Sequence, residues 1–359
     1  MALEYQDHRE DPQGWAAALG ISREAIDVYL ASDVIDLHVD TFIWQRMLGY
    51  DMRTRHGLGP LRGRFFSQVD LVRIRQAQIS GAMWSITTSP WRSAKGRLRA
   101  FRQNLLRLKS ILESEPADVA LVRNLDEYKR ARGRGLHAAF IAIQGGNAVD
   151  ADLSALDALE DDVVVRVTLV HLSNSRIGDS SVPTLWGESR GLSNFGRAYV
   201  ELLNQRRVLV DLSHIGKRAF GDVVAMHDRS LPLVVTHTGV DGAYRCWRNL
   251  DDDQIRYVAQ FGGTVGIIFH SGYLNGRQIR RARVADVARH ILHVTRVVGD
   301  DHVSIGSDFD GMIVPPGDLP SCLELPRLVQ ALLEGGLSAE SISKILGGNF
   351  LRVLAQLRG

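Results

Sequence analysis

Short apolar segments recur along the chain, and helical or loop sequence separates them. Each is rich in β-branched residues and nearly continuous in apolar character, as expected of parallel strands buried on both faces. The predicted strands are 34–40, 79–86, 138–144, 163–170, 208–213, 233–236, 264–269 and 303–307. Eight strands alternating with helices predict an α/β fold, a (β/α)8 TIM barrel, with a doubly wound open sheet as the alternative.

The segments around these strands complete the predicted domain. We expect residues 1–30 to form a helical N-terminal extension. Apolar residues at helical spacing predict further helices over 68–78 and Ala94–Glu113. Residues 45–67 are rich in arginine and glycine and lack periodicity, so we expect a long loop and a candidate lid. We find no segment with the composition of a linker that would divide the chain into two domains. We therefore expect residues 1–359 to form a single domain.

Composition narrows the class of protein. The chain is 45% hydrophobic and 23% charged, which is typical of a globular protein with a full core. A net charge of +2 gives no general electrostatic case for nucleic acid. Two cysteines cannot build a disulfide framework, the N-terminus lacks a signal-peptide pattern, and no window is apolar enough to span a membrane. These features favour a cytoplasmic protein without membrane or nucleic-acid partners.

Polar residues stand where most of the predicted strands end. His38 and Asp40 are two residues apart, so on a strand they share one face. A barrel carries its active site at the carboxyl ends of its strands, where such side chains would converge. The residues at these ends are His38, Asp40, Gln144, His171, His214, His237, His270 and Asp308.

The residue types at these ends indicate a metal site. Any one of them alone is more often a hydrogen-bonded core residue or a turn residue, and His270 is the weakest candidate for ligand contact. Together, the set offers imidazole and carboxylate ligands that suit Zn²⁺ or a similar divalent ion: His38, Asp40, His214, His237 and Asp308. The pattern favours a metal-dependent hydrolase.

The chain also resembles the renal-type membrane dipeptidases, a branch of the metal-dependent amidohydrolase superfamily. Several motifs in fixed order carry the resemblance from about Val34 to Leu354, which makes it more specific than any one motif. They are DLHVDT, GAMWSIT, QGGNAV, VTLVHLSNS, VLVDLSHI, VVTHTGV, WRNLDDDQI, IGSDFDG and ILGGNFLRVL.

The resemblance implies a barrel with two metal ions that a carboxylate bridges, and a dipeptide or similar small carboxylate-bearing amide as substrate. One metal would be held by His38, Asp40 and Asp308, and the other by His214 and His237. His171 would polarise the scissile carbonyl, Arg248 would bind the substrate carboxylate, and Asp308 would also carry the proton from the attacking water to the leaving amine. A homodimer is a further implication.

Gln144 departs from the family pattern, because it stands where the bridging glutamate is expected. A neutral amide has one good oxygen donor and no formal charge, so two divalent ions would keep one positive charge uncompensated, which weakens the binding of at least one of them. Three explanations are open: an enzyme with one metal, or with a loosely held second metal and a shifted substrate range; a deliberate Glu→Gln substitution; or a non-catalytic relative that keeps the fold for binding. We favour the first, because every other functional position is retained.

Overall fold

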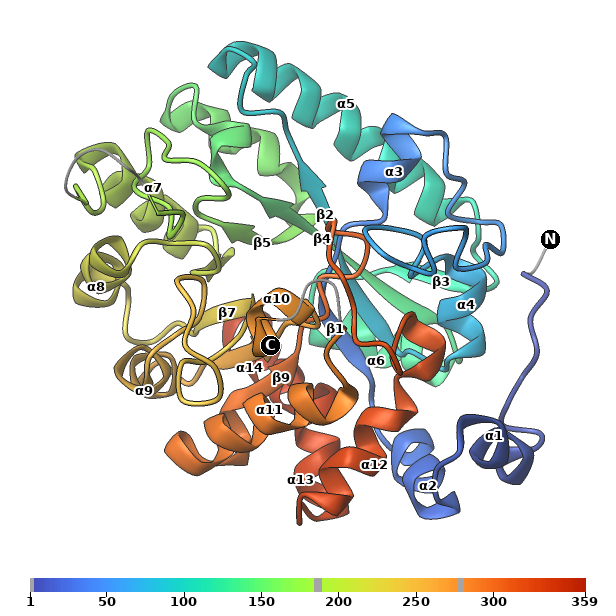
Figure 1. The fold of residues 1–359 in the computed structure, drawn as a ribbon. Helices are drawn as coiled ribbons and strands as arrows, with labels where there is room; N and C mark the ends of the chain where they lie inside the picture. The colour runs from blue at the N-terminus through green and yellow to red at the C-terminus, as the bar shows by residue number, and fades with distance from the viewer. Residues whose placement is uncertain (1–2, 184–188, 277–280) are drawn as a thin grey trace.

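A closed ring of parallel strands forms the centre of the computed structural model, which describes residues 3–183, 189–276 and 281–359 (Figure 1). The strand order along the ring is β1-β2-β4-β5-β6-β7-β8-β9, and each neighbouring pair is parallel. The strands are β1 Ile35–Val39, β2 Gly81–Thr87, β4 His137–Gln144, β5 Val164–Thr168, β6 Leu209–Asp211, β7 Leu233–Thr238, β8 Thr264–Ile267 and β9 Val303–Ile305. The (β/α)8 barrel predicted from the sequence is confirmed.

Helices surround the strands, as Figure 1 shows for α5, α7, α8, α9, α11 and α12. The longest, α5, begins after Ser93, whose side chain accepts a hydrogen bond from the backbone N–H of Gly96 and caps the helix. The α-helices are α1 Pro12–Leu19, α2 Arg23–Ala31, α3 Phe42–Met47, α4 Leu71–Gln76, α5 Ala94–Glu113, α6 Leu125–Gly133, α7 Asn194–Gln205, α8 Lys217–Met226, α9 Asp252–Gln260, α10 Ser271–Asn275, α11 Val284–Val298, α12 Pro326–Glu334, α13 Ala339–Ser343 and α14 Asn349–Arg358. No helix among the described residues is both long enough and apolar enough to cross a membrane.

Backbone contacts just beyond β9 close the ring against β1. The N–H of Asp308 donates to the carbonyl of His38 at 3.1 Å, and the N–H of Asp40 donates to the carbonyl of Phe309 at 2.9 Å. The ring is covered by apolar side chains, and every residue of β2 and β4 is buried, which explains why these strands are apolar almost throughout. The closure places the carboxyl ends of the first and last strands side by side.

The structure differs from the sequence-based expectation in two local elements. The predicted loop 45–67 begins inside α3, so its first three residues are helical, and residues 48–67 contain no helix or strand. The strand β3, Val119–Leu121, was not predicted; it pairs with the first residues of β4, off the ring. In Figure 1, α2 lies beside α12 at the outside of the barrel, and the two helices are in contact.

Candidate metal centre

The carboxyl ends of β1 and β9 bring three predicted ligands together. His38 Nε2 lies 3.4 Å from Asp40 Oδ2 and 3.6 Å from Asp308 Oδ1, and all three side chains are almost fully buried. The imidazole of His237, from β7, stacks on that of His38 with the ring centres 3.9 Å apart. Ligand atoms of His38, His237 and Asp308 all lie within 4.8 Å of one another, a spacing that a single metal ion could span.

The ends of β4 and β6 complete the cluster. His214 Nε2 lies 2.8 Å from His237 Nε2, and Gln144 Nε2 lies 3.5 Å from the same atom of His237. Gln144 is the last residue of β4, and its side chain is buried like those of the histidines. The structure thus gathers at one point the six residues for which the sequence predicted metal binding.

Several nitrogen and oxygen atoms of this cluster are buried but have no hydrogen-bond partner among the described residues. Such orphaned polar atoms are rare in folded proteins and indicate a missing partner. They are His38 Nε2, Asp40 Oδ1, Gln144 Oε1, His214 Nδ1 and Asp308 Oδ1. A set of imidazole and carboxylate donors without partners is what a divalent cation requires, so the residues fit such an ion.

Burial shifts the pKa values of several residues in the cluster, and a bound cation would oppose the shift at the carboxyl of Asp308. Desolvation lowers the pKa of His214 and that of His237 well below the ordinary value for histidine. Desolvation, together with the charge of Asp40, raises the pKa of Asp308 well above the usual range for a carboxyl. Both effects oppose the accumulation of like charge in a water-poor site, and a bound cation stabilises carboxylates and neutral imidazoles there.

Two residues of the cluster adopt the left-handed backbone conformation, which is uncommon outside glycine. His214 has a φ of 64° and Asp308 a φ of 60°. Such strain costs about 1–3 kcal/mol per residue and is concentrated at functional sites. Here it turns both side chains toward the same point at the end of the barrel.

His171 and Arg248 lie beside this cluster. The ring of His171 meets that of His214 edge-to-face with 4.7 Å between the ring centres, and enclosure lowers the pKa of His171 to about 4. Arg248 is buried, and its Nη2 donates to the carbonyl of His237 at 2.7 Å while Nε has no partner among the described residues. His171 is therefore neutral at neutral pH, and Arg248 keeps its Nε–H available for a ligand, together with the Nη hydrogens that these contacts do not use.

The weakest candidate, His270, does not join the cluster. Its Nδ1 accepts a hydrogen bond from the backbone N–H of Val314 at 3.0 Å, and its ring packs against Tyr273. These contacts attach the loop at Val314 to the start of α10, which is a structural role.

Arg166 and Asp211 were missed by the sequence reasoning. Both are fully buried in the barrel and form an ion pair of 3.1 Å. Arg166 Nη2 lies 2.9 Å from His38 Nδ1 and donates to Ser85 Oγ at 3.0 Å, while Ser85 Oγ lies 3.2 Å from the same Nδ1. The signal was available, because Arg166 interrupts the apolar strand VVRVT and Asp211 ends the apolar strand LVD.

These neighbours bear on the tautomer of His38. An arginine side chain only donates hydrogen bonds, whereas a serine hydroxyl can also accept them. Nε2 of His38 can bind a metal only when the ring carries its proton on Nδ1. Ser85 Oγ can accept that proton, whereas the 2.9 Å contact from Arg166 Nη2 favours an Nδ1 without a proton.

Comparison with known proteins places the chain in a family. The profile of the membrane dipeptidases, peptidase family M19, matches residues 22–358. The dipeptidase ataJ of Aspergillus terreus is 30% identical over 352 residues, which cover 90% of this chain and 84% of the relative.

Two solved structures share the fold. The probable dipeptidase PvdM of Pseudomonas aeruginosa has a TM-score of 0.81 at 21% identity and covers 94% of this chain and 98% of its own. A metallopeptidase of Rhodobacter sphaeroides, solved with a phosphinate mimic of the dipeptide L-Ala-D-Ala, has a TM-score of 0.79 at 24% identity, over 91% of this chain and 99% of its own. The family model and the relative show that this chain belongs to the membrane dipeptidase family and is a metal-dependent hydrolase of the dipeptidase type, which agrees with a cluster of residues that could hold a metal ion.

Proposed function

We propose that this protein hydrolyses dipeptides, or similar small amides with a free carboxylate, at a zinc centre formed by the ends of its barrel strands. His38, Asp40 and Asp308 would hold one ion, and His214 and His237 would hold the other. Gln144 would contribute a neutral oxygen donor. Zinc suits this mixture of imidazole and carboxylate ligands.

One observation carries the proposal. Residues that lie as far apart in the sequence as His38 and Asp308 converge on one buried point, where their donor atoms have no partner among the described residues. A purely structural polar cluster would satisfy these atoms internally, because an unsatisfied buried donor or acceptor costs about 1–3 kcal/mol. The convergence therefore supports a site built for a cation.

The side chains around the centre suit amide hydrolysis. When bound, the divalent ion lowers the pKa of a water molecule and polarises the scissile carbonyl. Asp308 would accept the proton of the attacking water and deliver it to the leaving nitrogen, a transfer that requires a carboxylate within hydrogen-bond reach. His171, neutral at the rim of the site, would donate a hydrogen bond to the oxygen that becomes negative as the tetrahedral intermediate forms.

Arg248 would define the length of the substrate. Its guanidinium is planar and always charged, and it can bind a terminal carboxylate through two parallel hydrogen bonds. The Arg248 side chain donates to the backbone of His237, so the anchor lies next to the proposed metal ligands. This arrangement leaves room for one residue between the carboxylate and the scissile bond, which favours dipeptides over longer peptides.

The neutral side chain of Gln144 bears on how tightly the two proposed metal ions bind. Because its side chain is neutral, we expect one tightly held ion and a second that dissociates readily. The alternatives are a hydrolase of another amide or ester and a non-catalytic binding protein. Gln144 is the observation that keeps these alternatives open.

The test uses the purified protein with a panel of dipeptides. We expect zinc-supplemented protein to release amino acids from at least one dipeptide, chelator to abolish the release, and added zinc to restore it. The matched control is Asp308→Asn, which removes the proposed proton carrier and should lower kcat by about 10²-fold or more. Bound metal without cleavage of any dipeptide would contradict the peptidase assignment and leave a hydrolase of another amide or ester.

A further inference from the structure

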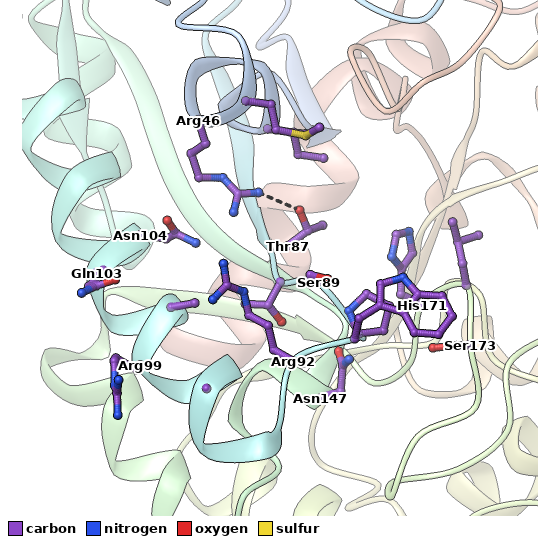
Figure 2. Close-up of a pocket in the computed structure, with 18 of the residues that line it drawn as sticks. Arg46, Thr87, Ser89, Arg92, Arg99, Gln103, Asn104, Asn147, His171 and Ser173 are labelled. Atoms are coloured by element: carbon purple, nitrogen blue, oxygen red, sulfur yellow. Dashed lines mark hydrogen bonds between the residues drawn. The ribbon is translucent and has the colours of Figure 1, made fainter.

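A cavity of about 780 Å³ opens beside His171, on the side of the site formed by α3, α5 and the residues that follow β2 (Figure 2). Its wall includes Arg46 from α3, Arg92 from the loop after β2, and Arg99 and Arg107 from α5. The cavity is larger than a single amino-acid side chain needs. It lies next to the proposed catalytic centre and shares His171 with it.

The wall of this cavity is positively charged, and no carboxylate among the described residues lines it. The helix α5 carries six basic residues and a single acid, Glu113, at its last position. Within the described parts of the chain, none of the four lining arginines forms an ion pair. By contrast, Arg97 on the same helix pairs with Asp150 at 2.6 Å and has a structural role.

Two contacts position Arg46 in the wall of the cavity. Its Nη2 donates to Thr87 Oγ1 at 3.2 Å, and its guanidinium lies 5.4 Å from the ring centre of Phe42. Its Nε is buried and has no partner among the described residues. Figure 2 shows Arg46 and Arg92 reaching into the same space from opposite sides.

The charges of these arginines act on one another. Burial lowers the pKa of Arg46, the nearby Asp40 raises it, and Arg107 and Arg92 lower it further. Arg46 is partly buried, whereas Arg92, Arg99 and Arg107 are exposed, so the repulsion acts mainly on Arg46, and an anionic ligand in the cavity would relieve it.

The position of Arg248 sets the direction in which a substrate would lie. Arg248 lines a different cavity, together with His214 and Trp247, on the side of β6 and β7. The ring of His214, which lines that cavity, meets the ring of His171, which lines the arginine-lined one. A dipeptide whose carboxyl terminus binds Arg248 would therefore extend its amino-terminal residue past His171 toward the arginines.

We propose that this cavity binds the acidic side chain of the amino-terminal residue, so that the preferred substrates are dipeptides beginning with glutamate or aspartate. The inference rests on the proposed function, since it uses the Arg248 anchor to orient the substrate. A charge-assisted hydrogen bond between a guanidinium and a carboxylate contributes enough free energy to change kcat/KM by about tenfold or more.

The test compares kcat/KM for Glu-Ala, Gln-Ala and Lys-Ala with the zinc-loaded enzyme. We expect Glu-Ala to exceed Gln-Ala by about tenfold or more, Lys-Ala to be the poorest, and the Glu/Gln ratio to fall as ionic strength rises. A Glu/Gln ratio of one or less in the intact enzyme would overturn the inference.

Substitutions of the lining arginines test whether the cavity causes the preference for glutamate over glutamine. Arg46→Gln should lower the Glu/Gln ratio, and so should the double substitution Arg99→Gln with Arg107→Gln, whose exposed positions on α5 should not disturb folding. The matched control is Arg102→Gln, because Arg102 is an exposed arginine of the same helix that does not line the cavity. An equal fall of the ratio in the Arg102 variant would show that only the overall charge matters and would overturn the assignment to the cavity.

A binding measurement separates this inference from the proposed function. Calorimetry with phosphinate mimics of Glu-Ala and Gln-Ala reports affinity whether or not the protein cleaves peptides. Tighter binding of the Glu-Ala mimic without cleavage of any dipeptide would support the acidic subsite and contradict the peptidase. Cleavage of dipeptides with equal binding of the two mimics would contradict the subsite alone, and binding of neither mimic would contradict both.

Discussion

Gln144 places a neutral amide among histidines and aspartates that suit a cation. Its Oε1 has no partner among the described residues, so it can serve as one metal ligand, and its Nε2 lies 3.5 Å from His237. A carboxylate at this position could give one oxygen to each of two ions and add a negative charge. The side chain therefore controls how much positive charge the site tolerates.

We predict that Gln144→Glu raises the metal content toward two ions per chain and raises dipeptidase activity by about tenfold or more, because the added charge stabilises the second ion. Elemental analysis and kcat/KM on the same preparation measure both effects. Gln144→Met, which is of similar length but lacks both oxygen and charge, is the control and should raise neither. Unchanged metal content and activity in the glutamate variant would show that the argument from charge is wrong.

Arg248→Lys tests the proposed carboxylate anchor. Lysine keeps the charge but loses the planar two-point geometry, so we expect KM for dipeptides to rise by about 10–100-fold with a smaller change in kcat. A dipeptide with an amidated C-terminus lacks the carboxylate and should respond much less to the substitution. Equal losses for both substrates would mean that Arg248 acts in another way, for instance through its hydrogen bond to the carbonyl of His237.

Individual site residues were predictable to different degrees. His38 could be predicted because it lies on a strand of clear pattern, and Asp40 and Asp308 because each follows such a strand. Their distances could not, since these depend on the closure of β9 against β1. Arg166 could have been noticed as a charged residue in an apolar strand, but its contacts with Asp211 and His38 depend on how the strands are arranged around the barrel.

At the level of strands and helices, the strand β4 carries a polar residue of the candidate metal centre at one end and a polar residue with a structural role at the other. It ends with Gln144 in the candidate metal centre and begins with His137, which is fully buried at the opposite end. His137 Nδ1 lies 2.9 Å from the carbonyl of Ile79, and Trp84 Nε1 donates to His137 Nε2 at 3.3 Å. Because Nε2 accepts a hydrogen bond, the imidazole fits the site only when neutral, and burial lowers the pKa of His137 to about 4.

This environment predicts a pH effect on stability. The pKa of His137 is about 4 in the folded chain and about 6.5 when unfolded. The contribution of the neutral imidazole to the free energy of unfolding is therefore fully present above pH 6.5 and is lost as the pH falls toward 4. Relative to His137→Gln, the wild type should lose up to about 3 kcal/mol of unfolding free energy between pH 7 and pH 4. Urea denaturation of both proteins across this range measures the difference. A difference that does not change with pH would contradict the assignment.

The elements themselves followed closely from the sequence. The eight barrel strands and the helix Ala94–Glu113 were predicted because their patterns extend over enough residues. The elements α3 and β3 were not predicted, although β3 is as long as β6 and β9. The cavity beside α5 was also not predictable, because it combines arginines from three separate segments.

For the whole molecule, closure of the barrel is what creates the site. The first and last strands meet through the backbone of residues 38–40 and 308–309, and the remaining strands bring His214, His237 and Gln144 to the same end. The fold could be predicted from the alternation of strands and helices, and the motifs identified the family. Homodimerisation stays a prediction, because it depends on surfaces that no sequence pattern here distinguishes.

The most direct test is the metal content of the protein. We predict that wild-type protein grown with zinc and dialysed retains about one divalent ion per chain in elemental analysis, because the buried donors stabilise one ion strongly and Gln144 weakens the second. Less than about a tenth of an equivalent would contradict the metal centre and favour a binding protein built on the same barrel.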